Sequence, residues 1–136
     1  MEKKDLLKDV IKHIDIKSYN STELVDAMRN MSFTSRDTAR AADILMMMCK
    51  EKECTNILTL AGSTSAAGCM QVYVDMVRNK MIDVVVATGA SIIDMDLFEA
   101  LGFKHYIGEK ENVIADTTLR DLYIDRIYDT YIDEEE

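Results

Sequence analysis

The chain has 136 residues, 48% of them apolar, which excludes an intrinsically disordered protein and predicts a single domain over residues 1–136. A formal net charge of −9 argues against a nucleic-acid-binding protein, because phosphate backbones attract an excess of lysine and arginine. The apolar runs are too short for a membrane span and the charged N-terminus lacks a signal-peptide pattern, so we expect a cytoplasmic protein without a membrane partner.

The first part of the chain is predicted to be helical. Apolar residues recur at helical spacing over residues 3–13, and residues 13–17 alternate as in a short strand or an extended connection. Helix-start signals at Asn20 and Thr34 predict two further helices, of which the second ends near Lys50.

The middle of the chain has the pattern of a βαβ unit. Residues 55–61 are apolar and β-branched and predict a buried strand, which a turn of small residues, 62–68, follows. Helical spacing then continues to Asn79, and residues 82–88 form the clearest strand, apolar on both faces as in a central parallel strand. Two such strands joined by a helix predict an α/β fold with a parallel sheet and flanking helices.

The last part of the chain continues this pattern. A second glycine-bearing turn, 89–91, precedes a helix over residues 94–101 that is expected to stop at Gly102. Residues 105–107 are a candidate third strand, and Thr118 opens another amphipathic segment.

The two turns are the candidate functional loops. In open parallel sheets, ligands bind beyond the carboxyl ends of the strands, where residues 62–68 and 88–94 would lie. Backbone N–H groups, hydroxyls and a helix N-terminus in such loops attract phosphate. Neither loop has a G-x-G-x-x-G or Walker A pattern, so a tight turn with a helix cap explains them equally well.

Acidic residues follow the second loop. Asp94 and Asp96 could hold an ammonium group through charge-assisted hydrogen bonds, or could only complement the dipole of the helix that they open. The net charge likewise fits a cationic ligand, a basic protein partner or simple solubility.

The sequence shows no metal site and no nucleophile–base pair. Cys49, Cys54 and Cys69 lack C-x-x-C spacing and are expected to be buried reduced thiols. His13 and His105 are far apart in the sequence, and His105 is interpreted as a structural histidine.

Several segments, in order, resemble the deoxyhypusine synthase family. The resemblance covers nearly the whole chain from about His13, which makes it more specific than either loop alone. The segments are MSFTSRDTARAA at 31–42, LAGSTSAAG at 60–68, NKMIDVVVATGA at 79–90, DLFEALG at 96–102, KHYIG at 104–108 and DRIYDTY at 125–131.

The resemblance implies a Rossmann-like fold and a tetramer of paired dimers with active sites at subunit interfaces. It implies an enzyme that uses NAD to oxidise spermidine and then transfers the aminobutyl group to a protein lysine or to a small amine. Residues 61–65 and 92–96 resemble the bacterial-type branch, which leaves the acceptor open.

The resemblance also implies which residues contact ligands. The family's acidic pair, which contacts NAD and the polyamine, matches best at Asp94, with Asp96 beside it. The two NAD loops fall on Gly62, Ser63, Thr64, Ser65, Ala66, Thr88, Gly89 and Ala90.

The family's catalytic lysine lies in a C-terminal half, so no catalytic residue is expected before Glu136. The chain therefore resembles a truncated, N-terminal half that is active only with its C-terminal half. It is expected to form a homo-oligomer or to pair with a C-terminal half. A non-catalytic relative that oligomerises or regulates is the alternative. An unrelated nucleotide-binding module, resting on the loops alone, is a third hypothesis.

Overall fold

A computed structural model describes residues 1–108 and 113–135, which form two compact units within a mixed α/β fold. Unit 1 comprises Met1–Ile14, Leu60–Gln71 and Ala87–Glu136, and unit 2 comprises Asp15–Thr59 and Val72–Val86. Among the described residues, no helix is long and apolar enough to cross a membrane.

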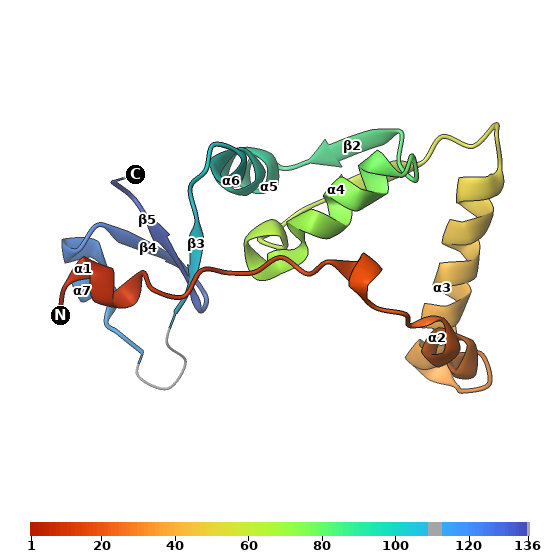
Figure 1. Cartoon of the computed structure of the whole chain (residues 1–136), viewed down its shortest axis with the longest axis horizontal. Helices are drawn as coiled ribbons and strands as arrows, with labels where there is room; N and C mark the ends of the chain where they lie inside the picture. Colours follow the sequence, from red (N-terminus) through yellow and green to blue (C-terminus); the bar gives the residue numbers. More distant parts are fainter. Residues whose placement is uncertain (109–112, 136) are drawn as a thin grey trace. The chain divides into compact units, whose positions relative to one another are not determined.

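Unit 1 contains a three-stranded antiparallel sheet in the order β3-β5-β4, with short helices around it (Figure 1). Tyr106 lies opposite Tyr131 in β3 and β5, and Ile127 lies opposite Thr130 where β4 turns into β5. The elements are α1 (Lys3–Leu6), η2 (Ser65–Cys69), α5 (Gly89–Ser91), η3 (Ile92–Leu97), α6 (Phe98–Ala100), β3 (His105–Ile107), α7 (Asp116–Asp121), β4 (Ile124–Ile127) and β5 (Thr130–Asp133).

The core of unit 1 lies between this sheet and the helices α1 and α7. Leu6, Leu119, Ile124 and Tyr131 are its buried members. Gly108 packs tightly against it, because a Cβ there would lie 2.9 Å from Tyr131 Cε1 and 3.0 Å from a backbone oxygen. Residues 105–107 form a strand, β3, as predicted, but it pairs antiparallel with β5 and not with β1 or β2, and the β4–β5 hairpin was not predicted.

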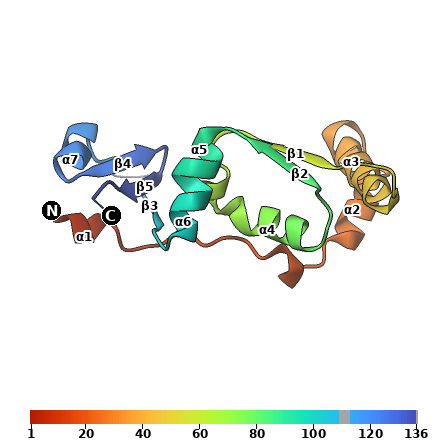
Figure 2. The same cartoon turned by 90° about the horizontal axis from the view of Figure 1, so that it is seen from above.

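Unit 2 is built from helices and most of a two-stranded ladder, which is drawn above α4 in Figure 2. Asn56 O accepts a hydrogen bond from Val84 N at 3.2 Å, and Leu60 O accepts one from Thr88 N at 3.2 Å, so the two strands run parallel as predicted. The elements are η1 (Ile16–Ser18), α2 (Thr22–Met28), α3 (Phe33–Lys50), β1 (Ile57–Leu60), α4 (Met70–Arg78) and β2 (Val84–Ala87), the last three of which share a few end residues with unit 1.

The predicted helix over residues 3–13 is wrong beyond Leu6, because the chain there is extended. Ile11 N donates to His105 O at 2.8 Å, and Ile107 N donates to Asp9 O at 2.7 Å. Pairing with the edge of β3 therefore overrides a local helical pattern, as tertiary contacts often do.

The two central strands are less buried than their sequence predicts. Val86 is 56% exposed and Ile57 is 55% exposed, and Val84 and Val85 are exposed as well. A two-stranded ladder leaves edges and faces uncovered, which explains the difference. The cysteines are free as expected, but they are not fully buried: Cys49 is exposed, and Cys54 and Cys69 are half-buried.

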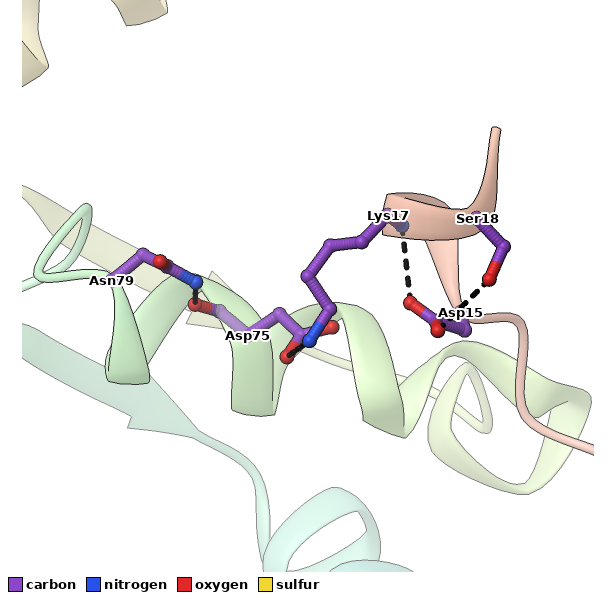
Figure 3. Close-up of polar contacts among 5 residues, drawn as sticks. All are labelled: Asp15, Lys17, Ser18, Asp75 and Asn79. Atoms are coloured by element: carbon purple, nitrogen blue, oxygen red, sulfur yellow. Dashed lines mark hydrogen bonds and ion pairs between the residues drawn. The ribbon is translucent and has the colours of Figure 1, made fainter. Parts of the chain in front are cut away.

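A polar cluster joins η1 to α4 within unit 2 (Figure 3). Lys17 Nζ donates to Asp75 Oδ1 at 2.8 Å, and the Asp75 side chain is only 5% exposed. Asp15 accepts hydrogen bonds from Lys17 N and Ser18 Oγ, which caps η1, and Asn79 donates to the backbone oxygen of Asp75 at 2.8 Å. The hydrogen bond to Asp75 raises the pKa of Lys17 above its ordinary value of 10.5.

Replacing Gly108 with alanine should destabilise the chain by about 1–3 kcal/mol, the usual effect of overpacking a tight core. Gly89→Ala is the matched control, because a Cβ at Gly89 meets nothing within 4 Å, and it should change stability by less than about 0.5 kcal/mol. Urea unfolding followed by circular dichroism measures both variants. Equal midpoints would show that the Gly108 contact is not a constraint.

Replacing Lys17 with methionine should lower the melting temperature, because Asp75 would keep a buried carboxylate without its cation. Exposed Lys52→Met is the control and should leave the melting temperature unchanged. A raised lysine pKa stabilises below pH 10.5 and loses this effect as the pH rises further, so the deficit of Lys17→Met should be constant from about pH 6 to 9. A deficit that vanished within that range would contradict the assignment.

Candidate functional site

The two candidate loops lie together at the ends of β1 and β2, and all of their residues belong to unit 1. The ladder bond from Thr88 N to Leu60 O brings the loops to the same edge. Beyond it, Ser91 Oγ donates a hydrogen bond of 2.9 Å to the Gly62 carbonyl, and Ser91 is fully buried. The fold therefore joins the two loops through a side chain that the sequence analysis did not single out.

The first loop has open space at its start and tight packing at its end. Gly62 has φ +80°, a conformation that favours glycine, and a Cβ there would meet nothing within 4 Å. Gly68 has φ +97°, but its Cβ would lie 3.0 Å from Lys12 O, and its carbonyl accepts a hydrogen bond from Ile14 N. Gly62 thus leaves room for a ligand, whereas packing against the N-terminal segment requires Gly68.

Ser65 is the most informative hydroxyl of this loop. It is fully buried, and its Oγ has no hydrogen-bond partner among residues 1–108 and 113–135. A buried polar group without a partner costs free energy that a bound ligand can recover. The residues of this loop therefore fit a polar ligand such as a dinucleotide.

The expected helix N-terminus behind this loop is replaced by a wide turn. Residues of η2 form a π-helical turn, and Gly68 inside it departs from helical geometry before α4 begins. The first loop therefore does not lead directly into the N-terminus of α4, and the dipole of α4 does not point at it through a continuous helix. Anion binding here would depend on the loop's own N–H groups and hydroxyls.

The second loop is the start of a helical segment rather than an open turn. Thr88 precedes α5 in an extended conformation, and its carbonyl accepts hydrogen bonds from Ser91 N and Ile92 N, each 3.1 Å long. A Cβ at Gly89 would meet nothing within 4 Å, so the backbone of this loop is also approachable. The helix over residues 94–101 thus begins earlier than predicted, at Gly89, and passes through the π-helical segment η3.

The two acidic candidates lie on η3 but have different surroundings. Asp94 is exposed, whereas Asp96 is half-buried and its Oδ1 has no hydrogen-bond partner in the described part of the chain. Residues two apart on a helix do not face each other, so one cation would not contact both carboxylates in the same way. Of the two, Asp96 is therefore the better candidate to accept a hydrogen bond from a bound cation.

Two histidines that are far apart in the sequence meet on one carboxylate. His105 Nδ1 lies 2.6 Å from Glu99 Oε1, and His13 Nε2 pairs with Glu99 Oε2. This cluster ties the N-terminal segment to α6 and β3, which agrees with a structural role for His105. No group of three or more histidine, cysteine or acidic residues in the described ranges could hold a metal ion.

A cavity of about 240 Å³ adjoins the first loop. Ser63, Thr64, Ala66 and Ala67 line one side, and residues 127–130 of the β4–β5 hairpin line the other. The hairpin was missed in the sequence, because its turn residues, Tyr128 and Asp129, include neither the glycine nor the asparagine that marks such turns.

Comparison with known proteins identifies the family. A family model described as deoxyhypusine synthase matches residues 23–136. A "Deoxyhypusine synthase-like protein" of Caulobacter vibrioides is 64% identical over 135 residues, which cover 99% of this chain and 36% of that protein. A protein of the same name in Coxiella burnetii strain RSA 493 is 58% identical over 134 residues, 98% of this chain and 38% of that protein.

A more distant relative carries a more specific name. "Probable deoxyhypusine synthase 2" of Methanosarcina acetivorans is 38% identical over 123 residues, which cover 90% of this chain and 35% of that protein. The chain thus spans between 35% and 38% of the length of these relatives. Because the family model covers most of the chain, the chain belongs to the deoxyhypusine synthase family.

Proposed function

We propose that residues 1–136 form the N-terminal half of the NAD-binding domain, with a Rossmann-like fold, of a deoxyhypusine synthase-like transferase. The observation that carries the proposal is the hydrogen bond from Ser91 Oγ to Gly62 O, which holds two loops of small residues together at the ends of two parallel strands. Ligands of open parallel sheets bind at such an edge. Membership of the family supports NAD as the ligand.

The proposed cofactor contacts come from the small and hydroxyl-bearing residues of the two loops. Open space at Gly62 and Gly89 would let the cofactor's phosphates approach the backbone, and a ligand would give Ser65 Oγ its missing partner. Bound NAD supplies the acceptor for a hydride removed from the substrate. The full set is Gly62, Ser63, Thr64, Ser65, Ala66, Thr88, Gly89 and Ala90.

The proposed substrate is a spermidine-like polyamine, whose aminobutyl group would pass to a protein lysine or a small amine. Asp96 is suited to hold an ammonium group, because one of its oxygens is buried without a partner in the described residues. Asp94 is exposed beside it and would add to the negative potential of a chain with net charge −9.

The nucleophile is proposed to lie outside this chain. A lysine that forms an imine must lose its proton, which requires a lowered pKa. Lys17 has the opposite environment, because its hydrogen bond to buried Asp75 raises its pKa. We therefore propose that a C-terminal half carries the catalytic lysine and that the chain is active only together with it. The chain itself is proposed to form a homo-oligomer or to pair with that half.

One observation favours a second candidate, a non-catalytic subunit that oligomerises or regulates a full-length relative. The apolar residues 84–86 of β2 and Ile57 of β1 are exposed in this chain. An exposed apolar ladder is a surface for association whether or not the assembly is an enzyme.

Alanine at Gly62 should weaken NAD binding by roughly tenfold or more, because its Cβ would enter the space open to the phosphates. Gly102→Ala is the matched control, since Gly102 also has a positive φ, of +106°, and open space at its Cβ, but lies outside both loops. Both variants should lose a similar stability of about 1–2 kcal/mol from left-handed backbone strain. Ligand-detected NMR with NAD measures the affinities, and an equal affinity of the two variants would contradict the cofactor site.

Mixing this chain with the C-terminal remainder of the Caulobacter vibrioides relative, NAD and spermidine should produce NADH, and neither piece alone should do so. Absorbance of NADH measures the reaction, and chain carrying Gly62→Ala is the control for dependence on the first loop. Association of the two pieces without NADH would favour the non-catalytic subunit instead.

A further inference from the structure

The cavity beside the first loop has two walls of different origin. One wall is the proposed cofactor loop, with Ser63, Thr64, Ala66 and Ala67, and the other is the turn of the β4–β5 hairpin, residues 127–130. Both walls belong to unit 1. The cavity thus connects the first loop to the β4–β5 hairpin, which is not part of either candidate loop.

The cavity is suited to part of a ligand rather than to the whole of one. Its volume is about 240 Å³, below the roughly 300–1,000 Å³ of pockets for drug-sized molecules. Ala66, Ala67 and Ile127 are the apolar residues of its lining, and Ser63 and Thr64 line it on the loop side. This combination fits a flat heteroaromatic ring attached to a polar sugar.

Tyr128 is unusual for its position at the tip of this hairpin. Ile127 pairs with Thr130, so Tyr128 and Asp129 form a two-residue turn, and Tyr128 has φ +55°. Turns of this kind favour glycine or asparagine at positive φ, and a bulky side chain there costs free energy. Packing among the described residues does not offset this cost, because Tyr128 is 91% exposed.

We infer that the tip of the β4–β5 hairpin is the second wall of the cofactor site, and that Tyr128 stacks on an aromatic base of NAD while Ser63 and Thr64 face its sugar. The inference rests on the proposed function, because it places a base of the same cofactor beside the first loop. Such a contact explains why a strained tyrosine is exposed at the rim of an apolar cavity. Aromatic rings stack with an offset geometry, in which one face of the ring can stay in contact with water.

The chain offers a matched control in Tyr123. This tyrosine is also exposed, at 57%, and also has a positive φ, of +54°, but it does not line the cavity. Asparagine adopts positive φ more readily than tyrosine, so Tyr128→Asn and Tyr123→Asn should both raise the melting temperature. If Tyr128 had a purely structural role, the substitution Tyr128→Asn would therefore stabilise the fold.

The test compares the affinity of the whole chain for NAD, by ligand-detected NMR, in four proteins: wild type, Tyr128→Asn, Tyr128→Phe and Tyr123→Asn. Tyr128→Asn should weaken NAD binding by roughly three- to tenfold, the size of one aromatic contact, although it stabilises the fold. Tyr128→Phe and Tyr123→Asn should bind like the wild type. Saturation transfer to the adenine or to the nicotinamide protons, lost in Tyr128→Asn, identifies the stacked base and supports the inference.

Two results would overturn the inference, and they differ in what they say of the proposed function. If Gly62→Ala weakens NAD binding while Tyr128→Asn binds like the wild type, the cofactor loop stands and the hairpin is not part of the site. If the wild-type chain shows no saturation transfer to NAD at millimolar ligand concentration, the inference and the proposed cofactor site both fail.

Discussion

The hydroxyl of Ser91 holds the candidate site together. It is buried at the start of the helical segment after β2 and donates to the Gly62 carbonyl at the end of β1. The ladder bond from Thr88 to Leu60 aligns the strands just before this point, and the Ser91 bond joins the loops beyond the strand ends. The space at Gly62 and Gly89 therefore depends on a residue that is not expected to touch the ligand.

The N-terminal segment supports the same loops from another side. Ile14 N donates to the carbonyl of Gly68, and the close approach of Lys12 to Gly68 explains why no side chain fits there. His13 adds a contact to Glu99, on the helical segment that begins with the second loop. This arrangement could not be predicted locally, because residues 9–14 have a helical spacing of apolar residues and become extended only through pairing with β3.

Elements with strong local sequence signals could be predicted, whereas elements that form through contacts with distant parts of the chain could not. The 18-residue helix α3 begins beside Thr34 and ends at Lys50 as its start signal and periodicity predict. The β4–β5 hairpin was missed because its turn carries Tyr128 in place of the glycine or asparagine that marks such turns. For the candidate site, the two loops could be proposed from their small residues, whereas the Ser91 bond between them and the hairpin beside the first loop required the structure.

The composition of β1 and β2 predicts more burial than the structure shows. The unbroken apolar run of residues 84–86 has the composition of a strand covered on both faces, yet its side chains are exposed here. An exposed valine contributes no stabilisation through the hydrophobic effect, because its surface stays in water. The apolar composition of residues 84–86 therefore fits a ladder whose faces are covered. The uncovered faces of the two-stranded ladder, and not a weak signal in the sequence, explain why its strands are less buried than predicted.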